Sequence, residues 1–242
     1  MTVDVVVENL SYAYPDDTLA LKNIDLAFNE GETHAVIGAN GAGKSTLLMH
    51  LNGTILPQHG SVNIKNCEIS KKSLSEIRRQ VGMVFQNPDD QLFMSKVYDD
   101  VAFGPSNMGL SDEEISARVD FALEKVGLKH LKQRHSAHLS TGEKKRVSIA
   151  TVLSMEPNII VLDEPSAGLD PGARRMLIEL LNSFNHTKII ATHDLDMALD
   201  VADIVTLLYN GEVFKQGSPI RIFSDNTLLK QCGLEPPLSM TR

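Results

Sequence analysis

The sequence predicts an α/β protein with a mainly parallel sheet. Two observations lead there: strand-sized apolar runs alternate with helical patterns, and one such run leads through a glycine-rich loop into a helix. The length of 242 residues and the hydrophobic content of 42% are enough for a substantial core. One large domain, or two closely packed lobes, is therefore expected.

The N-terminal region is predicted to form a small antiparallel sheet. Residues 3–7 alternate in polarity, as do residues 24–28, and a turn-rich segment at Pro15, Asp16 and Asp17 lies between them. Later strands are expected at 34–37, 62–65, 81–85, 159–162, 188–191 and 204–208. Asn210 and Gly211 indicate a hairpin after the last of these strands.

Residues 87–156 differ in character from the rest of the chain. Ser111 and Glu114 have the spacing of a capping box, which predicts a helix start. An apolar stripe with helical spacing follows, made of Ile115, Val119, Ala122, Leu123 and Val126. A helical insert in the α/β core is expected here.

Composition excludes several classes of function. The formal charge of −8 argues against a nucleic-acid partner, because counterion release needs a basic face. Two cysteines, Cys67 and Cys232, form neither a disulfide framework nor a metal-binding pair, which fits a reducing cytosol. The N-terminus does not have the pattern of a secretory signal, and no run reaches the roughly 18 apolar residues of a membrane span. Contact with a membrane is therefore expected only through a partner.

The glycine-rich loop matches the phosphate-loop pattern in the context that the motif requires, after a buried strand and before a helix at about 44–52. Backbone N–H groups freed by the glycines can point at phosphate oxygens, and the helix N-terminus adds partial positive charge. Lys44 is expected to bridge the outer phosphates, and the Ser45 hydroxyl to bind Mg²⁺. The expected nucleotide-binding residues are Gly38, Ala39, Asn40, Gly41, Ala42, Gly43, Lys44, Ser45 and Thr46.

The apolar run 159–162 ends in two adjacent carboxylates, Asp163 and Glu164. Ligands of α/β sheets bind at such strand ends. We expect Asp163 to hold Mg²⁺ through water and Glu164 to orient and deprotonate an attacking water. Together with the phosphate loop, this pair predicts a nucleoside triphosphatase.

Residues 139–143, Leu-Ser-Thr-Gly-Glu, open another amphipathic helix and closely resemble the signature motif of ABC ATPases. Gln86, the segment 166–170 and His193 resemble the Q-loop, D-loop and switch histidine of that family. With the phosphate loop and the carboxylate pair, these elements stand in the family's order over essentially the whole chain. The sequence is thereby identified as a member of the ABC ATPases, whose substrate is ATP.

The resemblance implies a single cassette, 1–242, of the P-loop NTPase class. Its RecA-like core and small N-terminal antiparallel β subdomain would occupy about 1–86 and 157–217. The inserted helical subdomain would occupy about 87–156, and a C-terminal tail 218–242. The tail is expected either to pack on its own domain or to help pair subunits.

The resemblance also implies a mechanism shared between two copies. The signature residues of one copy would face ATP bound to the other, and they are Ser140, Thr141, Gly142 and Glu143. Gln86 would sense Mg²⁺ or the attacking water, and His193 would hold the γ-phosphate and help to fix Glu164. Asp170 would shape the loop that touches the opposite subunit.

An aromatic residue near the N-terminus is expected to stack on adenine, with Tyr14 preferred and Tyr12 as the alternative. The signature departs from the family pattern at Thr141, which replaces a glycine, and at Glu143, which replaces a glutamine. The hypothesis that follows is weaker or slower closure of the dimer.

Residues 84–93, the segment 101–105, His138 and residues 144–147 resemble the ATPases of energy-coupling-factor transporters, particularly the CbiO-like cobalt importers and their nickel relatives. There an ATPase pair, of identical or different subunits, docks on a membrane scaffold at the cytoplasmic face of the cell membrane, and a separate membrane protein captures the substrate. Acidic and apolar residues beside Gln86 suit an amphipathic helix that carries arginine. They are Asp89, Asp90, Asp99, Asp100, Leu92, Phe93, Met94 and Val97.

Other residues receive simpler interpretations. His130, His135 and His138 are read as exposed or capping residues rather than metal ligands, because no carboxylate or cysteine supports them. Arginines in helical charge patterns are read as solvated faces or subunit contacts, namely Arg78, Arg79, Arg174 and Arg175. Alternative functions are a vitamin-importing ATPase of the same type, a soluble ABC ATPase and a catalytically silent partner subunit.

Overall fold

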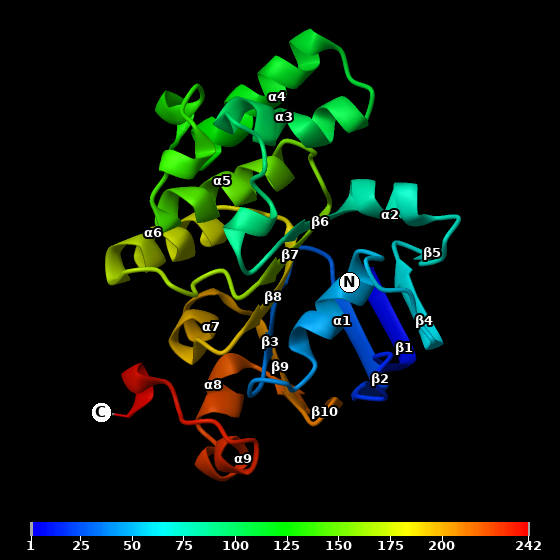
Figure 1. Ribbon diagram of the computed structural model, residues 1–242. Helices are drawn as coiled ribbons and strands as arrows, with labels where there is room; N and C mark the ends of the chain where they lie inside the picture. Colours follow the sequence, from blue (N-terminus) through cyan, green and yellow to red (C-terminus); the bar gives the residue numbers. More distant parts are fainter. Residues whose placement is uncertain (1, 242) are drawn as a thin grey trace.

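The computed structural model describes residues 2–241 and contains two sheets and a layer of helices (Figure 1). A six-stranded sheet lies at the centre, with the strand order β10-β9-β3-β8-β7-β6. Its strands are β3 (Thr33–Ile37), β6 (Val81–Val84), β7 (Ile159–Asp163), β8 (Thr187–Thr192), β9 (Ile204–Tyr209) and β10 (Glu212–Gly217). All pairings are parallel except that of β10 with β9. The predicted mainly parallel sheet is confirmed, as is the terminal hairpin.

The central strands form because both of their faces are covered. Every residue of β3, β6, β7 and β8 is buried. Parallel strands that are buried on both faces have nearly continuous apolar sequences, which is the pattern seen here. These strands direct their carboxyl ends to one edge of the sheet, where the loops that follow β3, β7 and β8 meet.

The second sheet is antiparallel and has the order β2-β1-β4-β5. Its strands are β1 (Val3–Ala13), β2 (Leu19–Asn29), β4 (His59–Ile64) and β5 (Cys67–Glu68). The predicted sheet is confirmed, but β1 continues six positions beyond the end expected at residue 7. Register shifts between Val7 and Leu10 and between Leu10 and Tyr12 interrupt the alternation, so that the sequence pattern hides the continuation.

Helix α1 (Lys44–Leu51) packs between the two sheets. Leu47 and Leu48 of this helix share one buried cluster with Val5 of the antiparallel sheet and Ile189 of the central sheet. The helix stops near Gly53, which has a left-handed φ of 69° and ends the helix as expected. Helix α2 (Leu74–Gln80) leads into β6.

A helical layer stands on one side of the core (Figure 1). It contains α3 (Val97–Asn107), α4 (Asp112–Lys125) and α5 (Thr141–Leu153), with the short η1 (Pro88–Asp90), η2 (Lys129–Leu131) and η3 (Ser136–His138). The capping box of Ser111 and Glu114 at the start of α4 is present, and the predicted apolar stripe is buried. The expected helical insert is confirmed.

Helices α6 (Pro171–Asn182) and α7 (Leu195–Val201) follow β7 and β8. The C-terminal tail forms α8 (Pro219–Phe223), α9 (Asn226–Gln231) and η4 (Leu238–Met240). Ile222, Phe223 and Leu229 are buried in a cluster with Ala35 and Leu195, so the tail packs on its own core. Within residues 2–241, none of the helices combines the length and apolarity needed to cross a bilayer.

Candidate functional site

The loop from β3 to α1 has a backbone that only glycine allows at two positions. A Cβ atom on Gly38 would lie 2.5 Å from the Leu208 carbonyl oxygen, and one on Gly43 would lie 2.6 Å from the Ala20 carbonyl oxygen. Gly43 also has a left-handed φ of 102°. These glycines therefore let the loop curl tightly over the end of the sheet before the helix begins.

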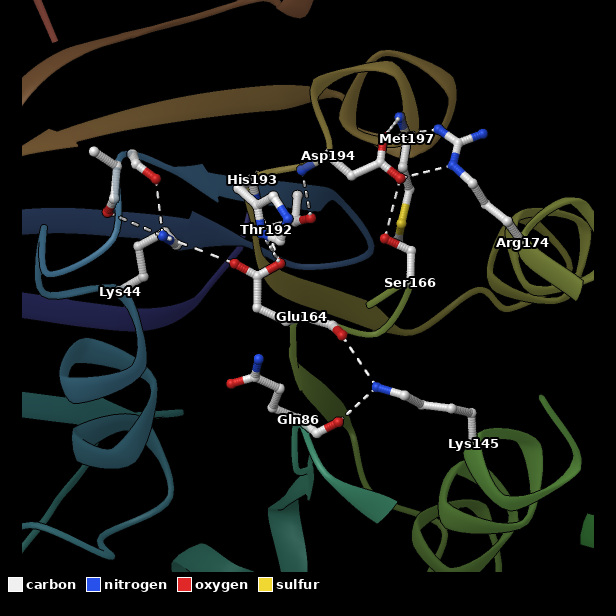
Figure 2. Close-up of polar contacts among 12 residues, drawn as sticks. Lys44, Gln86, Lys145, Glu164, Ser166, Arg174, Thr192, His193, Asp194 and Met197 are labelled. Atoms are coloured by element: carbon white, nitrogen blue, oxygen red, sulfur yellow. Dashed lines mark hydrogen bonds and ion pairs between the residues drawn. The ribbon is translucent and has the colours of Figure 1, made fainter. Parts of the chain in front are cut away.

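Lys44 is the first residue of α1, directly after this loop, and it is almost fully buried. Figure 2 shows its polar contacts. Its Nζ donates to the carbonyl oxygens of Gly38 at 2.8 Å and Ala39 at 3.2 Å. The same Nζ lies 3.8 Å from Oε1 of Glu164. The lysine charge is thus held between the loop and the carboxylate that follows β7.

Glu164 has an unusual backbone conformation for a non-glycine residue, with a φ of 44°. Its N–H donates to Ala191 O at 2.8 Å, which anchors it to the neighbouring strand. Its Oε2 accepts from the His193 backbone N–H at 3.2 Å and lies 2.8 Å from His193 Nδ1. A strained residue that its surroundings hold so firmly is typical of a functional position.

Asp163 is buried at the end of β7, and its Oδ1 has no hydrogen-bond partner among the described residues. Burial raises the pKa of Asp163, while a hydrogen bond with Ser45 acts in the opposite direction. An oxygen without a partner beside a hydroxyl matches the oxygen ligands that Mg²⁺ prefers. Asp163 and Ser45 therefore fit an Mg²⁺ ion.

A cleft of about 410 Å³ brings together most of the predicted nucleotide-binding and catalytic residues, but Gly38, Ala39 and Asp163 are not part of its lining. Its lining comes from the phosphate loop, the start of β2, and the loops after β6, β7 and β8. The lining residues are Tyr14, Thr18, Leu19, Ala20, Asn40, Gly41, Ala42, Gly43, Lys44, Ser45, Thr46, Gln86, Glu164 and His193. The sequence interpretation missed Thr18, Leu19 and Ala20, since an edge strand of a small sheet carries no motif.

The two candidate aromatic residues have different environments. Tyr14 lines the cleft, and its hydroxyl lies 2.9 Å from the Thr46 hydroxyl oxygen. Tyr12 packs against the buried cluster under α1, with its ring centroid 5.0 Å from that of His50. Of the two tyrosines, Tyr14 alone lines the cleft.

The signature residues lie apart from the cleft of their own chain. They line a separate hollow of about 360 Å³ together with Gly168 and Asp170. Ser140 caps α5: its Oγ accepts from Glu143 N at 3.3 Å, while its own N–H and hydroxyl donate to Glu143 Oε2 at 2.7 and 2.8 Å. Asp170 caps α6 by accepting from Gly172 N and Ala173 N.

The expected docking surface is only partly correct. Leu92 and Val97 are buried, and so is Asp100, whose carboxylate accepts from the backbone N–H groups of Phe93 and Met94. The sequence pattern did not distinguish inward from outward positions in this irregular segment. The predicted members that are exposed are Phe93, Asp89, Asp90 and Asp99, and Asp89 forms an ion pair with Lys144 at 2.6 Å. Phe103 of α3 adds a second exposed ring next to Phe93.

Arg174 was expected on a solvated face or at a subunit contact, but it makes an ion pair within the chain. Its guanidinium donates twice to Asp194, at 2.7 and 2.8 Å. Ser166 Oγ donates to the same carboxylate at 3.1 Å, and Asp194 also caps α7 by accepting from Met197 N (Figure 2). This network links α6, the D-loop and the residue after His193.

The histidines near the signature lie at the surface. His130, His135 and His138 are exposed. His135 Nδ1 accepts from Ala137 N at 3.2 Å, which makes it the cap of η3. Its ring lies 5.2 Å from that of His138, centroid to centroid.

Comparison with known proteins agrees with this geometry. The family model of the ABC transporter matches residues 21–167. A putative ABC transporter ATP-binding protein of Geobacter sulfurreducens is 54% identical, over 98% of this chain and 95% of the relative. The energy-coupling factor transporter ATP-binding protein EcfA of Methanocaldococcus jannaschii is 47% identical, over 96% of this chain and 85% of the relative.

Solved structures give the same result. The structure of cbiO1 from Clostridium perfringens, described as part of the ABC transporter complex cbiONQ, is 42% identical. The superposition covers 96% of this chain and 94% of the cbiO1 chain, with a TM-score of 0.84. The dimeric structure of the bacterial cassette MJ0796 is 28% identical, covers 89% and 98% of the two chains and has a TM-score of 0.81. The chain therefore belongs to the ABC transporter ATPases, as an ATP-binding subunit of the energy-coupling-factor, CbiO-like type.

Proposed function

We propose that the chain hydrolyses ATP as one of a pair of subunits and thereby drives the import of cobalt or nickel ions. The proposal of ATP hydrolysis rests on one observation: Lys44, Glu164 and His193 lie together in one cleft. At the carboxyl edge of a parallel sheet, a cation can bind phosphate and a carboxylate can accept a proton from water, as phosphoryl transfer to water requires, and an imidazole can orient that carboxylate.

Each residue has a role that follows from its position. Lys44 binds the outer phosphates of ATP, and the loop N–H groups bind the phosphate oxygens that surround it. Glu164 takes a proton from the attacking water, and His193, 2.8 Å from its carboxylate, orients that carboxylate and contacts the γ-phosphate. Gln86 reaches into the same cleft from the Q-loop, where its amide can orient the water.

The residues for Mg²⁺ are Ser45 and Asp163, with Gln86 at the cleft edge. Asp163 Oδ1 is buried without a partner, which favours this assignment. The ion, when bound, supplies positive charge to the β- and γ-phosphate oxygens.

A second copy of the chain, or a related subunit, completes the site. Ser140, Thr141, Gly142 and Glu143 line a hollow that shares no residue with the cleft of the same chain. A helix N-terminus with a serine hydroxyl is suited to an anion, so we place the γ-phosphate of the partner's ATP there. Asp170, in the same hollow, lies where the two copies would meet.

The exposed surface beside the Q-loop is the proposed contact with a membrane scaffold. Phe93 is 62% exposed and Phe103 is 43% exposed, and their ring centroids are 5.0 Å apart. Asp90 and Asp99 provide negative charge near this aromatic pair. An amphipathic helix with arginine on its rim would satisfy both features. The chain would then work at the cytoplasmic face of the cell membrane, with residues 87–156 as the part that contacts the scaffold.

The test is reconstitution with the membrane proteins that copurify with the chain. Vesicles that contain the complex and ATP are expected to accumulate Co²⁺ or Ni²⁺, and the same complex with Glu164→Gln is expected to lose uptake while it still binds ATP. Uptake of a vitamin instead of either ion would replace the proposed substrate, and absence of any membrane protein after mild purification would contradict the import role.

A further inference from the structure

Lys145 is a buried cation that the proposed mechanism does not use. It lies on α5, five residues after Ser140, and only 3% of its surface is exposed. Its Nζ donates to the backbone carbonyl oxygens of Gln86 at 2.6 Å and Glu164 at 3.2 Å (Figure 2). One side chain therefore touches the Q-loop and the backbone of the proposed catalytic glutamate.

Burying an ammonium group is costly, so its contacts need an explanation. Burial lowers the pKa of Lys145, although the charges of Glu164 and Asp163 oppose this effect. A methionine of similar volume would fill the space without this cost. What only the lysine provides is a pair of directed hydrogen bonds to two separate loops.

The three connected points belong to different parts of the molecule. Helix α5 starts at the signature motif, Gln86 lies where the chain leaves β6 for the helical layer, and Glu164 lies where it leaves β7. Glu164 has a left-handed backbone that needs support from its surroundings. A shift of α5 relative to the core would change both bonds of Lys145 and, through them, the Glu164 backbone.

We propose that Lys145 is a positioning residue that ties the signature helix and the Q-loop to the backbone of Glu164, so that the carboxylate is aligned only when the helical layer is correctly placed. This inference rests on the proposed function of Glu164. It predicts an effect on the rate of the hydrolytic step and none on ATP binding, because Lys145 does not line the cleft.

Lys188 provides a matched control. It is also a buried lysine, 4% exposed, and its Nζ donates to the Phe184 carbonyl oxygen at 2.6 Å. Burial lowers its pKa as it does that of Lys145. It lies on β8 outside the cleft, so its replacement removes a similar bond without contact with the proposed site.

The experiment compares Lys145→Met and Lys188→Met in the full-length chain, with thermal unfolding, ATP affinity, and steady-state kcat and KM. Thermal unfolding shows whether both variants are folded at the temperature of the assay. Lys145→Met is expected to lower kcat about tenfold with KM within about twofold of the wild type, since small misplacement of a reacting group has large kinetic effects. Lys188→Met is expected to retain the wild-type kcat.

Equal kcat losses in the two variants, or a loss in Lys145→Met that lies in KM, would overturn the proposal. If Lys145→Met does not fold, Lys145→Gln serves in its place, because a neutral amide cannot reach both carbonyls. If the wild type hydrolyses ATP and Lys145→Met keeps the full kcat, the proposed role of Lys145 is refuted and the proposed function is not. A wild-type chain without ATPase activity refutes the proposed function itself.

Discussion

At the scale of single residues, neighbouring tyrosines take different roles. Tyr12 and Tyr14 touch edge to face, with ring centroids 5.1 Å apart. Tyr12 packs against the buried cluster under α1, whereas Tyr14 lines the cleft and its hydroxyl lies 2.9 Å from that of Thr46. The difference follows from the end of the strand, because β1 ends at Ala13 and Tyr14 lies beyond it.

Tyr14→Ala is expected to weaken ATP binding about fivefold, because a stacked aromatic contact contributes about 1 kcal/mol. Tyr14→Phe keeps the ring and loses only the hydroxyl, so its ATP affinity is expected to stay within about twofold of the wild type. Titration of both variants with a nonhydrolysable ATP analogue makes the comparison. Equal affinities for Tyr14→Ala and the wild type would exclude stacking by this residue.

Glu143 brings a carboxylate to the start of α5, where the phosphate of a partner's ATP is proposed to bind. It caps the helix through Ser140, and these hydrogen bonds lower the pKa of Glu143. The charge is therefore retained at neutral pH, in a place where it opposes a second anion. The bond to Ser140 also occupies the hydroxyl that would face the phosphate.

Glu143→Gln is expected to raise the ATPase rate severalfold, because the amide oxygen preserves the cap while the charge is lost. Thr141→Gly is expected to act in the same direction by removing a branched side chain. Glu114→Gln is the matched control, since Glu114 forms the same capping box with Ser111 on α4. Rates unchanged from wild type in both signature variants would refute the idea that this motif slows closure.

At the scale of elements, α6 and α7 are joined by a paired aspartate. Asp194 caps α7 and accepts two bonds from Arg174 of α6. Burial by itself would raise the pKa of Asp194, but the bonds from Arg174 and Met197 N outweigh it, and the pKa is lowered. A carboxyl with a lowered folded-state pKa stabilises the fold above its unfolded pKa, and this contribution disappears as the pH falls through the folded value.

Asp194→Asn is expected to reduce the free energy of unfolding by about 1 kcal/mol at neutral pH, because both partners are partly exposed to solvent. The difference from the wild type is expected to vanish below the pKa of the folded state. Asp225→Asn is a suitable control, since Asp225 caps α9 through Leu228 N. Denaturant unfolding of the wild type and of both variants, from neutral to acidic pH, measures the free energies of unfolding. If Asp194→Asn remains less stable than the wild type in acid, the ion-pair explanation is wrong.

The surface beside η1 is the other feature at this scale. Asp90 is exposed and precedes Phe93 by three positions, and Phe93 pairs with Phe103. Asp90→Lys is expected to reduce copurification of the membrane scaffold at least severalfold while ATP affinity stays unchanged, because a like charge would face the arginine of the docking helix. Glu179→Lys makes the same change on an exposed position of α6 and is expected to keep the scaffold bound. Equal retention by both variants would show that docking occurs elsewhere.

At the scale of the whole molecule, the sequence predicted those strands and site residues that one continuous segment identifies by its own pattern. Strands buried on both faces appear as apolar runs, so β7 was placed to within one residue of Ile159–Asp163. The phosphate loop and the Asp163-Glu164 pair were visible for the same reason. The proposed role of Lys145 could not be predicted from the sequence, because it depends on the carbonyl oxygens of Gln86 and Glu164, which are 59 and 19 positions away.

The proposed function requires a second copy of the chain or a related subunit. The cleft and the signature hollow are separate surfaces of one molecule. Two antiparallel copies would bring each hollow onto the other's cleft, so that ATP becomes part of the interface. Such an arrangement couples hydrolysis to the separation of the subunits.

The most direct test is the structure of the Glu164→Gln chain with MgATP, because this variant is expected to bind ATP and not to hydrolyse it. The account predicts a dimer in which Ser140 of each copy lies within hydrogen-bond distance of the γ-phosphate held by the other copy's phosphate loop. Ser140 far from every bound triphosphate, in a chain that stays monomeric at saturating MgATP, would contradict it.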